Sequence, residues 1–172
     1  MSAQTRLQRF WCSRDGSYSL DDDGFLRDPN AAMLHTESAG TGIEATEQLG
    51  DYRCLVLLGE PGAGKSTAIA DTTFLAAGGV SVLAFDLSSY GSEDRLVREV
   101  FEAPSLADWS SGSGQLCLVL DALDEARARI PHIGSIIASR LRQLPCDRLF
   151  VRIACRTADW PASLERICCT NR

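Results

Sequence analysis

Residues 54–67 read CLVLLGEPGAGKST, and this stretch decides how the rest of the chain is interpreted. The apolar run Cys54–Leu58 predicts a buried strand, and the pattern G-x-x-x-x-G-K-[ST] that follows is typical of a phosphate-binding loop opening a helix. Gly62 and Gly64 permit a tight bend that turns successive backbone N–H groups toward one point. The helix that begins near Lys65 adds the positive end of its dipole. The stretch therefore predicts a site for the phosphates of a nucleotide.

The residues of this loop are expected to have different roles in binding. Lys65 supplies a compact ammonium for the β- and γ-phosphates, and Ser66 supplies a hydroxyl ligand for Mg²⁺. Lys65 is the only lysine among the 17 basic residues, all the others being arginine. A flexible point charge is thus kept where a planar guanidinium would serve less well. The loop residues expected to contact the nucleotide are Gly59, Glu60, Pro61, Gly62, Ala63, Gly64, Lys65, Ser66 and Thr67.

Length and composition indicate a globular chain of one domain, or one domain with an arm. The chain has 172 residues, an apolar content of 45% and a formal net charge of −6. The negative charge argues against a protein built mainly to bind nucleic acid. No apolar run approaches the roughly 18 residues of a membrane span, and no signal-peptide core is evident at the N-terminus. We therefore expect a cytoplasmic protein without a membrane partner, and reduced thiols at its seven cysteines.

Apolar runs alternate with helical patterns along the rest of the chain. The expected strands are Cys54–Leu58, 80–85, 116–120 and Leu149–Cys155. The expected helices run from the phosphate loop to about Ala77, from a cap at Ser92, through 133–144, and from Pro161. This order of β-α-β units predicts an α/β fold, a three-layer P-loop NTPase core with a mostly parallel sheet of about four strands over residues 51–172. The carboxyl ends of its strands would share one rim.

Residues 1–50 are expected to form an N-terminal arm. Asp15 and Gly16 lie between the short apolar runs Phe10–Cys12 and 18–20, and this arrangement predicts a β-hairpin. Residues 43–49 predict a short helix that leads into the first core strand.

A second motif follows the strand predicted over 116–120. Asp121 ends that strand, which is the place of the Walker B aspartate that holds Mg²⁺, usually through water, opposite the Ser66 hydroxyl. Asp124 and Glu125 come next and are placed to orient or deprotonate an attacking water. The alternative is a solvated acidic loop after a core strand. The sequence leaves open which of the two acids acts on water.

The run 121–125, DALDE, resembles the signature of the NACHT branch of the STAND signalling ATPases. The resemblance extends to 152–157, RIACRT, which looks like the sensor 1 strand of that family. It implies that Arg156 contacts the γ-phosphate, and that the ATP state forms a homo-oligomer and activates an attached effector. By analogy it also implies a role in bacterial defence against phage.

The chain departs from this family in two respects. A fifth strand, which the family places beside the phosphate-loop strand, does not follow before Arg172, and neither do the modules that close over the nucleotide and mediate oligomerisation. The leading expectation is therefore a partial NACHT-like module that binds Mg-ATP and hydrolyses it slowly. One alternative is a nucleotide-binding interaction fragment without turnover. Another is a small-molecule P-loop kinase, with Arg127 and Arg129 as lid residues.

Overall fold

The computed structural model describes residues 9–16, 42–70 and 79–169 of the chain. The chain divides into two units, Met1–Asp51 and Tyr52–Arg172. In the described parts of the first unit, β1 (Phe10–Cys12) pairs antiparallel with β2 (Ile43–Ala45), and a 3₁₀ helix, η2 (Thr46–Asp51), follows directly. Within the second unit, four parallel strands and a series of short helices form an α/β fold.

One prediction for the first unit was wrong, and another falls partly outside the described residues. The turn after β1 is present, since the Gly16 N–H donates to the Ser13 carbonyl at 2.9 Å. The described partner of β1 is β2, and the hairpin partner predicted at residues 18–20 lies outside the described residues. The helix predicted over 43–49 is a strand followed by η2. The Gln48 side chain accepts a hydrogen bond from the Ala45 N–H at 2.8 Å, which caps η2 and fixes its start after β2.

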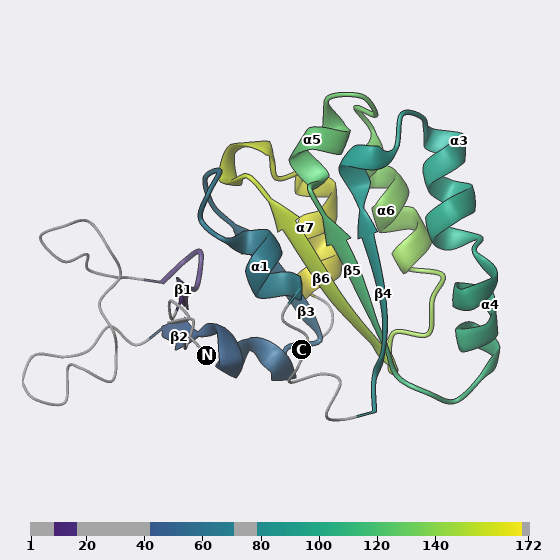
Figure 1. Cartoon of the computed structure of the whole chain (residues 1–172), viewed down its shortest axis with the longest axis horizontal. Coiled ribbons are helices and arrows are strands. Elements are labelled where there is room, and N and C mark those ends of the chain that lie inside the picture. The colour runs from purple at the N-terminus through teal and green to yellow at the C-terminus, as the bar shows by residue number, and fades with distance from the viewer. Residues whose placement is uncertain (1–8, 17–41, 71–78, 170–172) are drawn as a thin grey trace, which may run out of the picture. The chain divides into compact units, whose positions relative to one another are not determined.

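The sheet of the second unit has the strand order β3-β6-β5-β4 (Figure 1). Its strands are β3 (Cys54–Leu58), β4 (Ser81–Asp86), β5 (Leu116–Asp121) and β6 (Leu149–Cys155). All three neighbouring pairs are parallel, which confirms the predicted α/β class and mostly parallel sheet. Register partners at the carboxyl ends are Leu58 with Cys155 and Asp86 with Asp121. These ends therefore lie at one rim.

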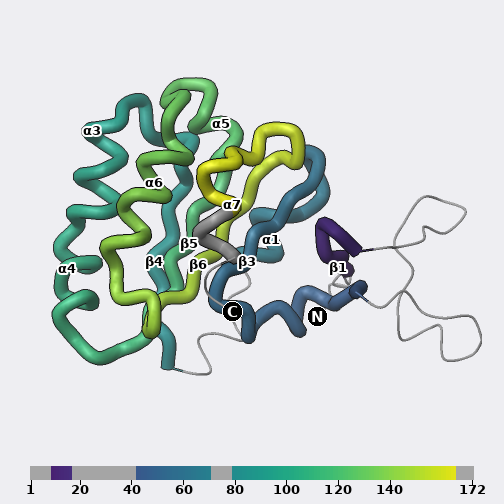
Figure 2. The backbone as a smooth tube through the Cα atoms, turned by 180° about the vertical axis from the view of Figure 1, so that it is seen from behind, coloured from purple at the N-terminus to yellow at the C-terminus, as the bar shows by residue number. Residues whose placement is uncertain are grey.

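The helices of the second unit lie on both faces of the sheet. They are α1 (Lys65–Ala70), α3 (Glu93–Leu96), η4 (Val97–Phe101), α4 (Pro104–Ser111), α5 (Leu123–Arg127), α6 (Ile133–Leu141) and α7 (Ala162–Cys169). Figure 1 shows α1 on the near face of the sheet, and Figure 2, the view from behind, shows α6 and α7 on the opposite face. The arrangement is compatible with three layers.

Two helices, α4 and α5, were not predicted. Pro104 follows the helical segment that ends at Phe101 and opens α4, because proline fits the first helical turn. The acidic stretch after β5 forms the short helix α5 rather than a loop. The predicted continuation of α1 to Ala77 lies outside the described residues.

The core is centred on β5, because this strand has a neighbour on each side and helices over it. Leu116, Leu118 and Leu120 are each at most 1% exposed. Residues of α5, α6, β6 and α7 pack in the same cluster: Leu123, Ile133, Ile137, Ile153 and Leu164. Gly134 in α6 allows a close approach of the chain before α7, since a Cβ there would lie 2.7 Å from Pro161. The buried sheet thus gives its carboxyl rim a rigid support.

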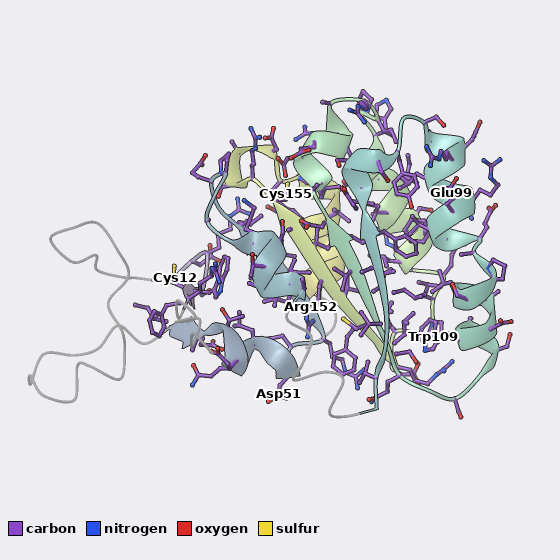
Figure 3. The ribbon with its side chains drawn as sticks, in the orientation of Figure 1. Cys12, Asp51, Glu99, Trp109, Arg152 and Cys155 are labelled. Atoms are coloured by element: carbon purple, nitrogen blue, oxygen red, sulfur yellow. The ribbon has the colours of Figure 1, made fainter. Side chains whose placement is uncertain are left out.

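Arg152 is a buried cation within β6, at only 1% exposure. Its Nη1 donates to the Val151 carbonyl at 3.0 Å and to the Arg53 carbonyl at 3.5 Å. Burial lowers the pKa of its guanidinium. Figure 3 shows Arg152 toward the end of the sheet opposite Cys155, so this cation lies away from the carboxyl rim.

Candidate functional site

The loop between β3 and α1 has the sharp course that the sequence predicts. Gly62 and Gly64 have φ values of 83° and 81°, in the left-handed region that favours glycine. The Ala63 N–H donates to the Glu60 carbonyl at 3.2 Å and closes a turn. The Ala68 N–H donates to the Gly64 carbonyl at 2.9 Å, so helical hydrogen bonding begins within the loop. Residues 60–63 are exposed, which leaves the loop open to a ligand.

The Lys65 ammonium lies against the loop itself. Its Nζ donates to the Gly59 carbonyl at 2.7 Å and to the Glu60 carbonyl at 2.9 Å. These two bonds hold the charge at the bend, next to the backbone groups that an anion would meet. A phosphate bound there would accept a charge-assisted hydrogen bond from the same ammonium.

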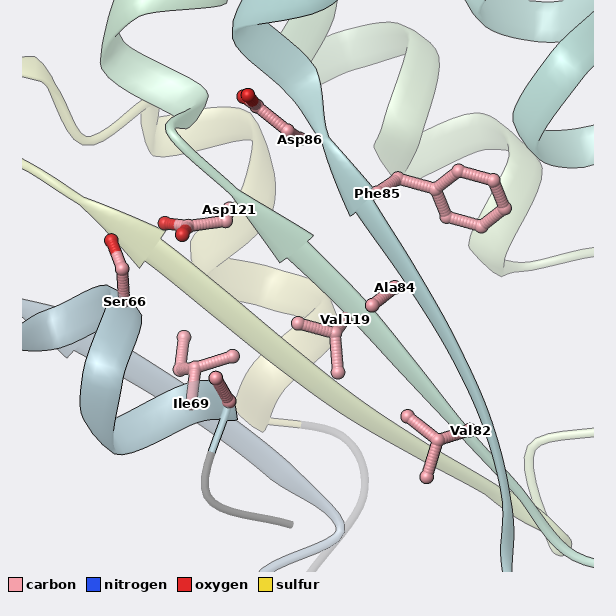
Figure 4. Close-up of a pocket in the computed structure, with 9 residues that line it drawn as sticks. Ser66, Ile69, Val82, Ala84, Phe85, Asp86, Val119 and Asp121 are labelled. Carbon is pink, nitrogen blue, oxygen red and sulfur yellow. The ribbon is translucent and has the colours of Figure 1, made fainter.

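Ser66 and Asp121 line one cavity of about 340 Å³. Figure 4 shows their side chains pointing toward each other, Ser66 from α1 and Asp121 from the end of β5. Asp86 also lines this cavity, and it is the register partner of Asp121 on β4. The remaining lining residues are apolar: Ile69, Ala70, Val82, Ala84, Phe85 and Val119. The fold therefore brings together a hydroxyl and a carboxylate that are far apart in the sequence.

These two oxygen donors fit the magnesium ion that the loop implies. Mg²⁺ prefers oxygen ligands and keeps several of its waters, so one or two protein side chains are enough. Among residues 9–16, 42–70 and 79–169, no group of three or more histidines, cysteines or acids could enclose a metal ion. The pair of Ser66 and Asp121 instead suits a metal that is shared between protein, water and phosphate.

Asp121 is oriented by the residue that follows it. Its Oδ1 accepts a hydrogen bond from the Ala122 N–H at 2.7 Å. Ala122 has φ 56°, and no other non-glycine residue in the described part of the chain has a positive φ. A side chain in this region costs roughly 1–2 kcal/mol, and the strain is least for a small residue. This left-handed turn starts α5 directly at the rim.

The helix α5 places the two candidate acids in different environments. Asp124 is paired with Arg156: Nε of Arg156 lies 2.8 Å from Oδ2, and the Arg156 N–H donates to Oδ1 at 3.2 Å. The Asp124 side chain is 9% exposed, against 45% for that of Arg156. Glu125 is exposed. Asp124 therefore holds the turn after β6, while Glu125 is open to water.

Arg127 and Arg129 serve as structural ties that the sequence did not reveal. Arg127 donates to the Asp159 carbonyl at 2.7 Å, in the 3₁₀ turn η5 (Thr157–Asp159) after β6. Arg129 donates to the Ser88 carbonyl at 2.6 Å, in the turn η3 (Leu87–Ser89) after β4. Both therefore fasten the chain around α5 to neighbouring strand ends. Lid residues, as the kinase alternative expects them, would instead be available to a substrate.

Cys155 is the last residue of β6 and directly precedes Arg156. It is buried, and burial, together with the nearby carboxylates of Asp124 and Asp159, raises the pKa of its thiol to about 12. Burial also raises the pKa of Cys117. Both thiols consequently stay protonated in the folded chain at pH values where an exposed thiol ionises.

The raised pKa of Cys155 predicts a loss of stability in alkali. Between the ordinary thiol pKa of 9.0 and about 12, the unfolded thiol releases its proton while the folded one keeps it. Stability therefore falls as pH rises above about 9, by up to about 1.4 kcal/mol per pH unit for each such thiol. Urea unfolding at pH 8 to 10.5 should give a shallower decline for Cys155→Ala, and an unchanged one for the exposed Cys146→Ala. Equal slopes in both variants would contradict the expected linkage.

Comparison with known proteins assigns no relative to this chain, since no protein-family model and no curated protein matches it. Among the described residues, no helix is long and apolar enough to cross a membrane.

Proposed function

We propose that the second unit binds Mg-ATP at residues 59–67 and hydrolyses it slowly. The observation that carries this proposal is the cavity lined by both Ser66 and Asp121, directly beside the phosphate loop. A serine at the start of a helix and an aspartate at the end of a buried strand are the two protein oxygens that magnesium–triphosphate chemistry uses. Their convergence supports a site for a nucleotide rather than for phosphate alone.

Each residue of the proposed site has a distinct role. The N–H groups around Gly62 and Gly64 bind phosphate oxygens, and Lys65 exchanges its bonds to loop carbonyls for bonds to phosphate. Magnesium, when bound, neutralises the charge that develops on the β- and γ-oxygens. Ser66 and Asp121 would hold it. The described residues contain no evident group that would recognise the nucleotide base, and ATP is proposed because it is the default nucleotide for such a site.

Glu125 is the acid proposed to take the proton of the attacking water. The Asp124 side chain is only 9% exposed, and both its oxygens are bonded to Arg156 in this structure, so little of its carboxylate faces water. Glu125 is exposed one residue further along α5 and can turn toward the rim. A carboxylate that is free to accept a hydrogen bond is the better general base.

The resemblance to NACHT-type STAND ATPases supports a wider proposal. In this proposal the unit is the nucleotide switch of a cytoplasmic signalling protein that forms a homo-oligomer in its active state. By analogy, the protein would serve in bacterial defence against phage. The strand β3 lies at one edge of the described four-stranded sheet, which is the side where the family places its fifth strand.

Calorimetry with ATP, in the presence and absence of Mg²⁺, tests the proposal. Wild type should bind ATP more tightly with Mg²⁺ than without it. Asp121→Asn should reduce this Mg²⁺-dependent increase in affinity about tenfold. The amide keeps an oxygen for the Ala122 N–H, so only the charge is lost. Asp108→Asn, an equal change of charge at an exposed position of α4, should bind like wild type.

The same experiment separates the alternatives. Binding without phosphate release would favour the interaction fragment, and phosphate transfer to an added metabolite would favour the kinase. Absence of any heat of binding with Mg-ATP contradicts the proposed function altogether.

A further inference from the structure

Asp124 and Arg156 form a two-point contact at the rim of the sheet. One oxygen of Asp124 accepts from the side chain of Arg156 at 2.8 Å and the other from its backbone N–H at 3.2 Å. The carboxylate is 9% exposed, whereas the guanidinium side chain is 45% exposed. A nearly buried acid is thus satisfied by one residue, while the cation that satisfies it faces solvent.

The backbone of Arg156 follows directly on the strand beside the one that leads into the loop 59–67. Leu58 of β3 and Cys155 of β6 are register partners. The next residues, Gly59 and Arg156, therefore leave two neighbouring parallel strands side by side, about 5 Å apart in backbone. An arginine side chain spans that separation, and its planar fork matches the geometry of a phosphate. Two anions, the Asp124 carboxylate and a phosphate on the loop, can compete for one cation.

We propose that Asp124 is a positioning residue that holds Arg156 away from the nucleotide until the terminal phosphate of ATP takes the guanidinium over. This inference rests on the proposed function, because it requires a triphosphate on the loop. ADP lacks the terminal phosphate and leaves Arg156 on Asp124, so the exchange distinguishes ATP from ADP. The turn η5 stays in place during the exchange, since Arg127 holds it through the Asp159 carbonyl.

Asp124→Asn isolates this role from the fold. The amide oxygen of asparagine still accepts from the Arg156 N–H, but an NH₂ group replaces the acceptor of the guanidinium bond. With Mg²⁺, the variant should bind ATP roughly three- to fivefold more tightly than wild type and ADP equally well. Arg156→Ala should weaken the binding of ATP but leave the binding of ADP unchanged. The double variant should match Arg156→Ala, because Asp124 acts only through Arg156.

Arg127→Gln is the matched control, since it removes the other tie between α5 and η5 without touching Arg156. It should keep the wild-type ratio of ATP to ADP affinity. The inference is overturned if Asp124→Asn leaves ATP affinity unchanged or lowers it, or if Arg127→Gln raises it equally. If the wild type binds Mg-ATP, either of these outcomes overturns the inference but not the proposed function. A wild type that binds neither nucleotide overturns the proposed function and this inference together.

Discussion

Lys65→Ala should weaken ATP binding by more than about 100-fold, the largest effect on affinity expected of any single substitution in the chain. The ammonium is held at the bend by the Gly59 and Glu60 carbonyls, at 2.7 and 2.9 Å, so its charge is in place before a ligand arrives. Charge-assisted hydrogen bonds to phosphate contribute about 1.5–3 kcal/mol each, and two such bonds account for the expected loss. Calorimetry with Mg-ATP measures it.

Lys65→Arg is the control for charge alone. A branched guanidinium cannot place a single donor between two loop carbonyls as an ammonium does, so this variant should also lose most of the affinity. Thermal unfolding should change little in either variant, since the Lys65 side chain is only half-buried. Wild-type affinity in Lys65→Arg would show that net charge, rather than the fitted ammonium, binds the phosphates.

The single lysine permits a second measurement on the unaltered protein. An amine-reactive reagent has only Lys65 and the chain's N-terminus to modify. Saturating Mg-ATP should protect Lys65, because its Nζ then lies beneath phosphate. Modification of Lys65 at the same rate with and without nucleotide would place the nucleotide elsewhere on the molecule.

The buried strands could be predicted from the sequence because their signal is local. Cys54–Leu58 is a continuous apolar run, Leu149–Cys155 is an apolar run interrupted only by Arg152, and both have the bounds that the sequence indicates. The partner of β1 could not be predicted, since a three-residue strand carries almost no register information. The opening of α4 was missed because proline marks both the end of one helix and the first turn of the next.

The candidate site shows the same division between local and distant information. The bend at Gly62 and Gly64 follows from two glycines in a known spacing, and the meeting of Ser66 with Asp121 follows from parallel topology. The contact of Asp124 with Arg156, by contrast, joins α5 to the turn after β6. It depends on how these short elements pack at the carboxyl ends of the strands. Ionic side chains at helix surfaces usually face solvent, so no pattern in the sequence marks this pair.

Glu125→Gln should lower the rate of ATP hydrolysis by about 100- to 10,000-fold, the range attributed to general acid–base catalysis. ATP affinity should stay within about twofold of wild type, because the exposed Glu125 side chain is one position beyond the rim contacts of Asp124. Glutamine keeps the size and the hydrogen-bonding oxygen of glutamate but cannot accept a proton from water. Phosphate release under saturating Mg-ATP, with calorimetry on the same preparation, separates turnover from binding.

Asp124→Asn is the matched comparison, because it changes the neighbouring acid on the same short helix. It should keep turnover within a few-fold of wild type, since it leaves Glu125, the acid that is open to water, unchanged. If Asp124→Asn abolished hydrolysis and Glu125→Gln did not, the roles of the two acids would be reversed. In that case the Asp124 carboxylate, released when ATP takes over the Arg156 guanidinium, would accept the proton of the attacking water. Glu125 is the better placed of the two acids, because its side chain is exposed, whereas the Asp124 side chain is only 9% exposed and also accepts a hydrogen bond from the Arg156 backbone N–H.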